Sequence, residues 1–179
     1  MEFVSIHDKN FRPYLSAPEI DAAVTRIAGK LNHDLKDKEV VFLVVLNGAF
    51  MFAADLLKKI KLSTRISFVK LTSYEGTRSS GQVQELIGIN EIIKDKVVVL
   101  VEDIIDTGNT LNKLLENTEK HQPAEIRVVS LLLKPDVYAC NRPVDYVGIH
   151  VPDEFVVGYG LDYDGFGRNL NEIYTVVEL

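Results

Sequence analysis

Hydrophobic residues along this chain follow two patterns, and each pattern predicts a different kind of element. Apolar residues that recur every three or four positions give a helix one apolar face, and this spacing predicts helices at 17–34, 49–60 and about 109–121. Unbroken apolar runs predict strands that are buried on both faces, as in a parallel sheet. Those runs and shorter apolar segments place strands at 40–46, 65–72, 83–89, 97–102, 125–133, 145–151 and 173–177.

Strands and helices alternate along the chain, which indicates an α/β fold with a mostly parallel central sheet and helices on both faces. The sequence contains no repeat, low-complexity tract or linker, so we expect residues 1–179 to form a single domain. Residues 1–15 show no clear periodicity and are expected to form an arm or a short strand on the body of the domain. Ser16 to Glu19 fits a capping box with a proline in the first turn, which predicts the start of the first helix.

Two connecting segments differ from ordinary polar turns. Residues 73–82, SYEGTRSSGQ, contain two glycines and three serines and little that could be buried, which is typical of an exposed lid or binding loop. Asn47 and Gly48 end the strand at 40–46, and this pair predicts a tight turn with positive φ.

Composition narrows the class of protein. The 179 residues are 46% hydrophobic and 26% charged, as in a soluble globular protein. The formal net charge is −6 and no long basic block occurs, which argues against nucleic acid as a partner. Cys140 is the only cysteine, so an internal disulfide is impossible. The N-terminal segment lacks the apolar region of a signal peptide, and no apolar run is long enough to span a membrane. We therefore expect a cytoplasmic protein with no membrane partner.

Motifs of several large enzyme classes are absent. The sequence contains no G-x-x-x-x-G-K-[ST] loop, no G-x-G-x-x-G after a strand, no G-x-S-x-G elbow and no H-E-x-x-H. The four histidines, at positions 7, 33, 121 and 150, lack the spacing of metal ligands. The sequence therefore lacks the main evidence for four enzyme classes: P-loop NTPases, dinucleotide-dependent oxidoreductases, α/β-hydrolases and zinc peptidases.

The segment 97–111, VVVLVEDIIDTGNTL, combines two kinds of polar chemistry. Its apolar strand runs into the adjacent carboxylates Glu102 and Asp103, and residues 106–110, Asp-Thr-Gly-Asn-Thr, then precede a helix. Free backbone N–H groups and the helix dipole attract anions at such a place. Carboxylates beside a phosphate cradle suit a phosphorylated sugar with its metal ion. Residues 106–110 could also be a plain capping turn, and the acidic pair could belong to a receiver domain, although there it normally lies near the N-terminus.

The core E-D-x-x-D-T-G-x-T of Val98 to Thr110 resembles the phosphoribosyl-pyrophosphate (PRPP) signature of the type I phosphoribosyltransferases, and among these it is most similar to the hypoxanthine-guanine group. The resemblance extends from about Val40 to Arg168. It includes Leu46 to Leu56, Ser73-Tyr74, Leu131 to Pro135, and Pro152 to Tyr163. It implies the type I phosphoribosyltransferase fold, with a mobile loop and a small hood that the N-terminal arm and the region after about 135 would contribute.

For the sugar and the phosphates, the resemblance implies the following roles. The 5′-phosphate would bind residues 106–110, namely Asp106, Thr107, Gly108, Asn109 and Thr110. Glu102 and Asp103 would contact the ribose hydroxyls and help to hold Mg²⁺, which prefers carboxylate and phosphate oxygens. Asp162 would bind a second Mg²⁺ on the pyrophosphate. The pyrophosphate itself would contact Asn47, Gly48, Ser73, Tyr74 and Arg168. Asp162 and Arg168 could equally form a surface ion pair.

For the purine, the resemblance implies a catalytic role for Asp106 near N7, either as general base or by stabilising the developing positive charge. Lys134 would donate a hydrogen bond to O6 and so select 6-oxopurines, although a lysine before a proline is more often simply exposed. Phe155 would stack on the base, and the main chain around Val156 and Asp162 would read its edge. Taken alone, Phe155 is more typical of a core residue.

The sequence also departs from the family pattern. Asn47 stands where a lysine often precedes the first-loop glycine, which removes a positive charge near the pyrophosphate. The stretch Asp164 to Gly167 is unusually rich in glycine, which leaves the register of Arg168 open. Asn109 occupies a variable position of the signature.

The resemblance implies a Mg²⁺-dependent glycosyltransferase of purine salvage. It would convert hypoxanthine, and guanine, with PRPP to IMP or GMP and pyrophosphate. Two alternatives remain: a transferase that prefers xanthine or guanine, and a PRPP-sensing regulator without catalysis. A regulator would be expected to have lost residues such as Asp106 or Asp162, which this chain keeps. Relatives form homodimers and homotetramers, and we expect one of these states.

Overall fold

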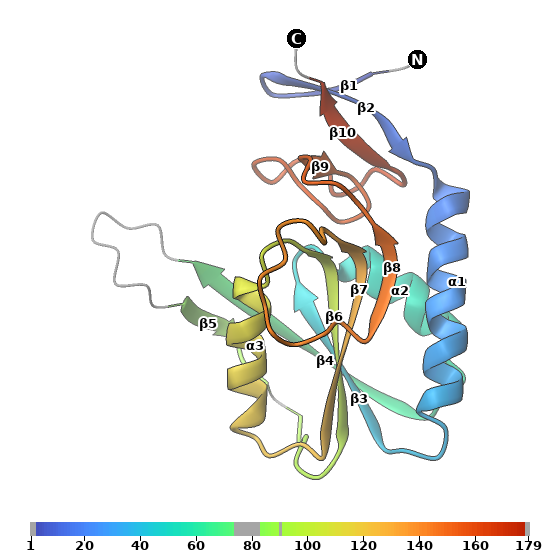
Figure 1. Cartoon of the computed structure of the whole chain (residues 1–179), viewed down its shortest axis with the longest axis vertical. Coiled ribbons are helices and arrows are strands. Elements are labelled where there is room, and N and C mark those ends of the chain that lie inside the picture. The colour runs from blue at the N-terminus through green and yellow to red at the C-terminus, as the bar shows by residue number, and fades with distance from the viewer. Residues whose placement is uncertain (1–2, 74–82, 90, 178–179) are drawn as a thin grey trace.

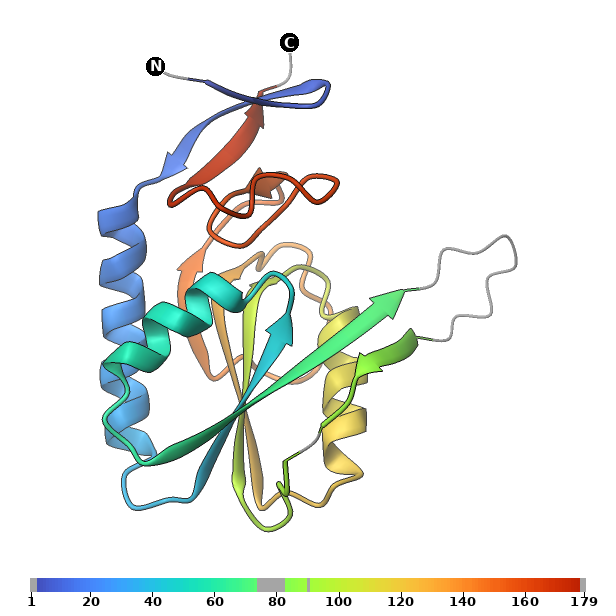
Figure 2. The same ribbon diagram turned by 180° about the vertical axis from the view of Figure 1, so that it is seen from behind.

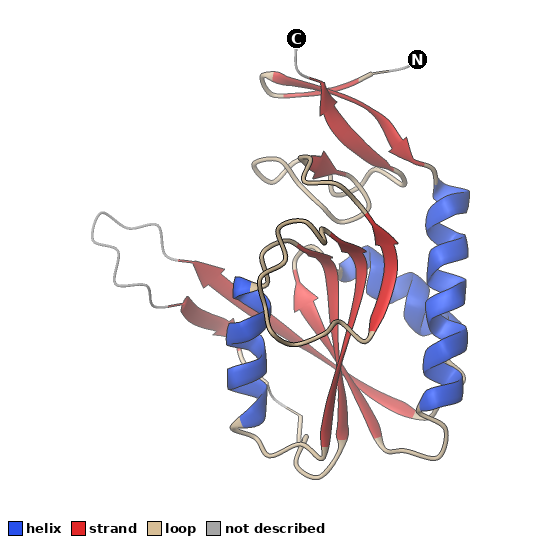
Figure 3. Ribbon diagram, in the orientation of Figure 1, coloured by secondary structure: helices blue, strands red, loops and turns tan. Residues whose placement is uncertain are grey.

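The computed structural model describes residues 3–73, 83–89 and 91–177, which form two sheets and three helices (Figure 1, Figure 3). The helices are α1 (Ala17–Asp34), α2 (Phe50–Lys59) and α3 (Asn109–Glu119). The larger sheet contains β3 (Val40–Leu46), β4 (Thr64–Ser73), β5 (Val83–Ile87), β6 (Val97–Ile105), β7 (Glu125–Leu133) and β8 (Tyr146–His150). The smaller sheet contains β1 (Val4–Ile6), β2 (Lys9–Leu15), β9 (Val156–Val157) and β10 (Ile173–Val177).

The larger sheet has the strand order β5-β4-β3-β6-β7-β8. Five of its strands are parallel, and only β5 pairs antiparallel, in a hairpin with β4. The central strands β3 and β6 are apolar on both faces and buried almost throughout, because helices cover both sides. The predicted α/β fold with a mostly parallel sheet is therefore confirmed.

Alternate side chains of the central strands pack into two separate cores. One core joins Phe42, Val44 and their neighbours to α1 and α2, whereas Leu43 and Val45 on the other face pack towards α3. Figures 1 and 2 show the helices on these two opposite sides of the sheet. The helical spacing read from the sequence is thus the spacing of the core-facing residues.

The first helix begins as its sequence predicts. The carboxylate of Glu19 accepts hydrogen bonds from the backbone N–H of Ser16, at 2.9 Å, and from its hydroxyl, at 2.6 Å. This is the glutamate half of a capping box, and it uses one backbone N–H that the helix itself cannot pair.

The strand pairing of the smaller sheet differs from what the periodicity predicted. Residues 1–15 were expected to form an arm or one short strand, but their described part forms two strands, and β10 lies between β2 and β9 rather than in the main sheet. Figure 1 shows this sheet beyond the carboxyl ends of the parallel strands. Periodicity in one segment carries no information on a partner more than 150 residues away, which explains the omission.

Two further details differ from the sequence prediction. β6 continues to Ile105, past the predicted end at 102, so Glu102 and Asp103 lie within the strand. Neither Asn47 nor Gly48 has positive φ, and the peptide bond between Leu46 and Asn47 is cis. The glycine is needed here for space rather than for its backbone angles, as the site geometry shows.

Replacing Leu31 by alanine should test the packing of α1. Leu31 is fully buried in the core shared by α1 and α2, and removing its side chain should lower the free energy of unfolding by about 2–5 kcal/mol. Denaturant unfolding followed by circular dichroism measures this loss. Lys30→Ala, on the exposed side of the same helix, should change stability by less than about 0.5 kcal/mol. Equal effects of the two variants would contradict this packing.

Candidate active site

The predicted phosphate loop lines a cavity of about 170 Å³ at the carboxyl end of β6. The lining residues are Glu102, Ile104, Ile105 and residues 106–111. Gly108 has a φ of 86° and is the residue before the first turn of α3, so the loop requires glycine at this position. The start of α3 and Asp106 therefore line the same cavity.

A second segment, which the sequence did not reveal, supports the phosphate loop from behind. The backbone N–H of Ala139 donates to the carbonyl of Thr107 at 3.1 Å. A Cβ on Gly108 would collide with the Cβ of Cys140 and the ring of Tyr138, so these residues leave room only for glycine. Residues 138–140 carry no periodic or motif signal, and only their contacts in the fold identify them.

Lys134 joins the carboxyl ends of three neighbouring strands. Its ammonium lies 2.7 Å from Oδ1 of Asp106, which follows β6, and 3.1 Å from Oδ1 of Asp153, which follows β8. Lys134 itself follows β7, and its backbone N–H donates to the carbonyl of Ile105 at 3.0 Å. The alternative of a simply exposed lysine is wrong, because only 10% of its side chain is exposed. The two carboxylates raise the pKa of Lys134 against the opposing effect of burial.

Glu102 and Asp103 carry adjacent carboxyl groups into the end of the sheet. Burial, and then the charge of Asp103, raise the pKa of Glu102 well above its usual value. Burial also raises the pKa of Asp103 to about 6, although backbone N–H groups and the nearby charge of Arg168 oppose the rise. Two like charges in a poorly hydrated position favour proton uptake or a bound cation.

The Asn47-Gly48 turn packs against Asp103 without any intervening side chain. A Cβ on Gly48 would overlap the carboxylate of Asp103, and a Cβ on Gly160 would overlap the carbonyl oxygen of Gly48. Asn47 itself is exposed. The structure thus brings the predicted pyrophosphate turn, the acidic strand end and the segment after β9 into direct contact.

Asp162 and Arg168 form an ion pair, which was one of the two outcomes considered for them. An Nη atom of Arg168 lies 2.6 Å from Oδ1 of Asp162, and the other Nη donates to the carbonyl of Gly160 at 2.7 Å. The backbone N–H of Gly165 donates to the second carboxylate oxygen of Asp162. The charges of the pair act on the pKa of Asp103 in opposite directions: Arg168 lowers it and Asp162 raises it.

Two of the predicted purine-side residues, Phe155 and Val156, lie at the start of β9 in the smaller sheet. Phe155 is 44% exposed, so it is not a core residue, and its ring packs edge-on against Tyr163 at 5.7 Å between ring centres. Val156 is buried in β9, where it pairs with Thr175 of β10. The hydroxyl of Thr175 donates to the carboxylate of Glu154 at 2.7 Å. Phe155 is thus a partly exposed aromatic residue directly before β9.

The predicted mobile loop falls largely outside the described residues. Ser73 is the last residue of β4, and Tyr74 with residues 75–82 is not described. Within the described ranges there is no group of three or more His, Cys, Asp or Glu side chains that could hold a metal by themselves. A metal at Glu102, Asp103 or Asp162 would therefore need further oxygen ligands from a substrate or from water.

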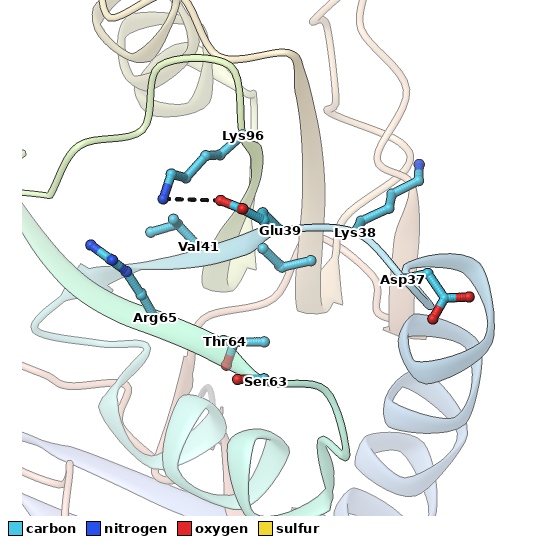
Figure 4. Close-up of a pocket in the computed structure, with 9 residues that line it drawn as sticks. Asp37, Lys38, Glu39, Val41, Ser63, Thr64, Arg65 and Lys96 are labelled. Carbon is cyan, nitrogen blue, oxygen red and sulfur yellow. Dashed lines mark ion pairs between the residues drawn. The ribbon is translucent and has the colours of Figure 1, made fainter.

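A larger cavity, of about 430 Å³, opens at the opposite, amino-terminal edge of the main sheet (Figure 4). Its basic side chains are already paired: Lys96 with Glu39 at 3.2 Å, and Arg65 with Glu91 at 3.3 Å. Its described lining contains none of the predicted site residues. The cavity at the end of β6 is therefore the better candidate for chemistry.

None of the described helices combines the length and the apolar composition that would let it cross a membrane.

Comparison with known proteins assigns this architecture. Residues 13–164 match the model of the phosphoribosyl transferase domain. A hypoxanthine-guanine phosphoribosyltransferase of Mycobacterium avium is 37% identical over 169 residues, covering 90% of this chain and 83% of the relative. A crystal structure of a hypoxanthine-guanine phosphoribosyltransferase from Bacillus anthracis superimposes with a TM-score of 0.86 at 37% identity, covering 93% of this chain and 97% of the other. A mutant hypoxanthine phosphoribosyltransferase from Trypanosoma cruzi, in a ternary complex with substrates, gives a TM-score of 0.85 at 35% identity, with 92% and 94% covered. This chain belongs to the phosphoribosyltransferase family.

Proposed function

We propose that this chain transfers the 5-phosphoribosyl group of PRPP to hypoxanthine, and to guanine, forming IMP or GMP and releasing pyrophosphate. The observation that carries this proposal is the contact between Lys134 and Asp106. Asp106 also lines the phosphate-loop cavity. The contact places a hydrogen-bond donor suited to a 6-oxo group beside a carboxylate suited to a purine nitrogen. The names of the similar proteins support the same reaction.

The phosphate loop would hold the 5′-phosphate of PRPP. Thr107, Asn109 and Thr110 are exposed, and their backbone lies at the start of α3, where N–H groups lack helical partners. Hydroxyl and N–H donors at a helix N-terminus bind phosphate strongly. Holding the phosphate fixes the ribose, and a fixed ribose brings its C1 within reach of the purine nitrogen.

Asp106 is the proposed catalytic residue. In the transfer, the bond from C1 to the pyrophosphate oxygen breaks with its electron pair, and a purine nitrogen forms the new bond to C1. Asp106 would accept the proton near N7 or stabilise the positive charge that develops there. Lys134 would break its contact with Asp106 and donate a hydrogen bond to O6. The 6-amino group of adenine could not accept this hydrogen bond.

The acidic residues fit a magnesium ion that the substrate helps to bind. Mg²⁺ in phosphate sites takes one or two carboxylates and completes its shell with water and phosphate oxygens, so the absence of a three-residue cluster among the described residues does not conflict with it. Glu102 and Asp103 would face the ribose side and Asp162 the pyrophosphate side. When bound, the ion would neutralise the leaving pyrophosphate, and Asn47, Gly48, Ser73, Tyr74 and Arg168 would contact its oxygens.

We also propose that residues 1–179 act as one domain, with the smaller sheet as a hood over the base. In this arrangement Phe155 stacks on the purine, and the main chain at Val156 and Asp162 reads its edge. A homodimer or homotetramer in the cytoplasm is the expected state. Ile66 and Phe68, 45% and 46% exposed on β4, support an association surface.

A turnover assay with PRPP and Mg²⁺ tests the proposed function. Hypoxanthine, guanine, xanthine and adenine are supplied in parallel, and formation of nucleotide and pyrophosphate is measured. We expect the highest kcat/KM with hypoxanthine or guanine, because the ammonium of Lys134 would donate a hydrogen bond to a 6-oxo group, and little or no turnover of adenine. Preferential use of xanthine would indicate the alternative specificity, and no product with any base would favour a PRPP-sensing regulator.

Replacing Asp106 by alanine should lower kcat with hypoxanthine by about 10²- to 10⁴-fold, the usual effect of removing a general acid or base. PRPP affinity, measured by calorimetry, should fall much less, because the backbone donors of the loop remain. Asp136→Ala, an exposed carboxylate two residues after Lys134, is the matched control and should retain turnover. Unchanged kcat in Asp106→Ala would refute the assigned role.

Replacing Asp103 by asparagine should stabilise the substrate-free protein at neutral pH but not in acid. The folded chain holds the proton of Asp103 up to a pKa of about 6, whereas the unfolded chain releases it near 3.8, so its contribution to stability decreases as pH rises through this interval. Above pH 6 the variant should gain roughly 1–3 kcal/mol, and below pH 4 nothing. Denaturant unfolding of the variant and the original chain at pH 4 and pH 7.5 measures these two stability differences. Glu116→Gln, on the exposed side of α3, is the control. A variant gain that does not depend on pH would contradict this account.

A further inference from the structure

Lys134 has a second carboxylate partner, Asp153, to which neither the sequence motifs nor the proposed chemistry gives a role. We propose that Asp153 is a positioning residue for Lys134: it holds the ammonium at the purine site while Asp106 exchanges its contact with Lys134 for one with the base. This inference rests on the proposed function and extends it to the order of contacts inside the site.

The three charged groups come from adjacent strand ends, which fixes their spacing. β6, β7 and β8 are neighbours and parallel, and Asp106, Lys134 and Asp153 follow them in that order. Hydrogen bonds across the strand ends hold this arrangement: Lys134 N–H to the carbonyl of Ile105 at 3.0 Å, and Val151 N–H to the carbonyl of Leu133 at 2.9 Å. These backbone hydrogen bonds by themselves position the lysine between its two partners, without any contribution from attraction between the side chains.

The two carboxylates are much more exposed to solvent than the lysine between them. The Lys134 side chain is 10% exposed, whereas those of Asp106 and Asp153 are 53% and 59% exposed. The ammonium is confined by packing, and the carboxylates have room to rotate towards solvent or a ligand. A change of partners therefore occurs by movement of Asp106, with Lys134 remaining in place.

Charge balance explains why one carboxylate would not suffice. An ammonium with Asp106 as its single partner would lose its whole counter-charge when Asp106 turned to the purine, and a buried unpaired cation is costly. With Asp153 at 3.1 Å, the cation remains neutralised throughout. A lysine has three N–H donors, so after Asp106 leaves, Asp153 occupies one and O6 can take another.

A surface ion pair without a role in the reaction is the alternative, since many exposed pairs contribute little. The two readings differ in one respect. If Asp153 acts through Lys134, its removal should have no effect once Lys134 is absent; an independent structural role would persist in that background.

The test is a double-mutant cycle with Asp153→Asn, Lys134→Ala and the combined variant, assayed in the whole chain with PRPP, Mg²⁺ and hypoxanthine. Asp153→Asn should raise KM for hypoxanthine about tenfold, as expected for the loss of one charge-assisted contact, and leave KM for PRPP within about twofold. Lys134→Ala should raise KM for hypoxanthine further, and the combined variant should match Lys134→Ala. Asp153→Glu should restore most of the loss.

Asp136→Asn serves as control, because it removes a neighbouring exposed carboxylate without touching the three groups. Thermal unfolding of each variant establishes that it is folded. Additive effects in the cycle, or an unchanged KM for hypoxanthine in Asp153→Asn, would overturn the role of Asp153 while leaving the proposed function intact. A wild-type chain that turns over no base would instead overturn the proposed function, and the role of Asp153 with it.

Discussion

The parallel pairing of β6 with β7 is the constraint on which the site depends. The two strands are in register from Val97 opposite Glu125 to Ile105 opposite Leu133, so their chains leave the sheet side by side. Asp106 and Lys134 are the next residues on each strand. A slip of one position would turn every side chain of a strand to the other face and would separate the two charges. The apolar runs that fill both cores thus determine which charged groups meet.

Many of the helices and strands could be predicted from the sequence, because the hydrophobic patterns that indicate them are local. Helix α1 and strands β3 and β7 have the predicted bounds, and Glu102 and residues 104–110 line one cavity. The residues that sequence reasoning missed meet the site through tertiary contacts. Tyr138 and Cys140 support the phosphate loop, and Asp153 reaches Lys134 from a different strand. Periodicity and spacing within one segment carry no information on such contacts between distant segments.

The acidic end of β6 illustrates a conflict between folding and chemistry. Glu102 and Asp103 are consecutive residues of β6 and both have raised pKa values, which costs stability in the free protein when they are charged. Elsewhere on the chain, carboxylates such as Glu19 and Glu125 have lowered pKa values because hydroxyl, backbone or lysine donors pair with them. These two carboxylates are stabilised by their donors, whereas at Glu102 and Asp103, the proposed sugar and cation site, the cost of burial exceeds the effect of the groups around them. Such strain is typical of functional sites.

The smaller sheet has a consequence for the order of assembly. β2 near the start of the chain pairs with β10 near its end, from Asn10 opposite Val177 to Leu15 opposite Ile173. Contacts between residues so far apart close a long loop and tend to form late. During synthesis, this sheet cannot form until the last strand has left the ribosome, whereas β3, β6 and α3 can already pack. The segment 106–110 and α3 would then be in place before Phe155, and a nascent or truncated chain would present the proposed phosphate loop without the proposed site for the base.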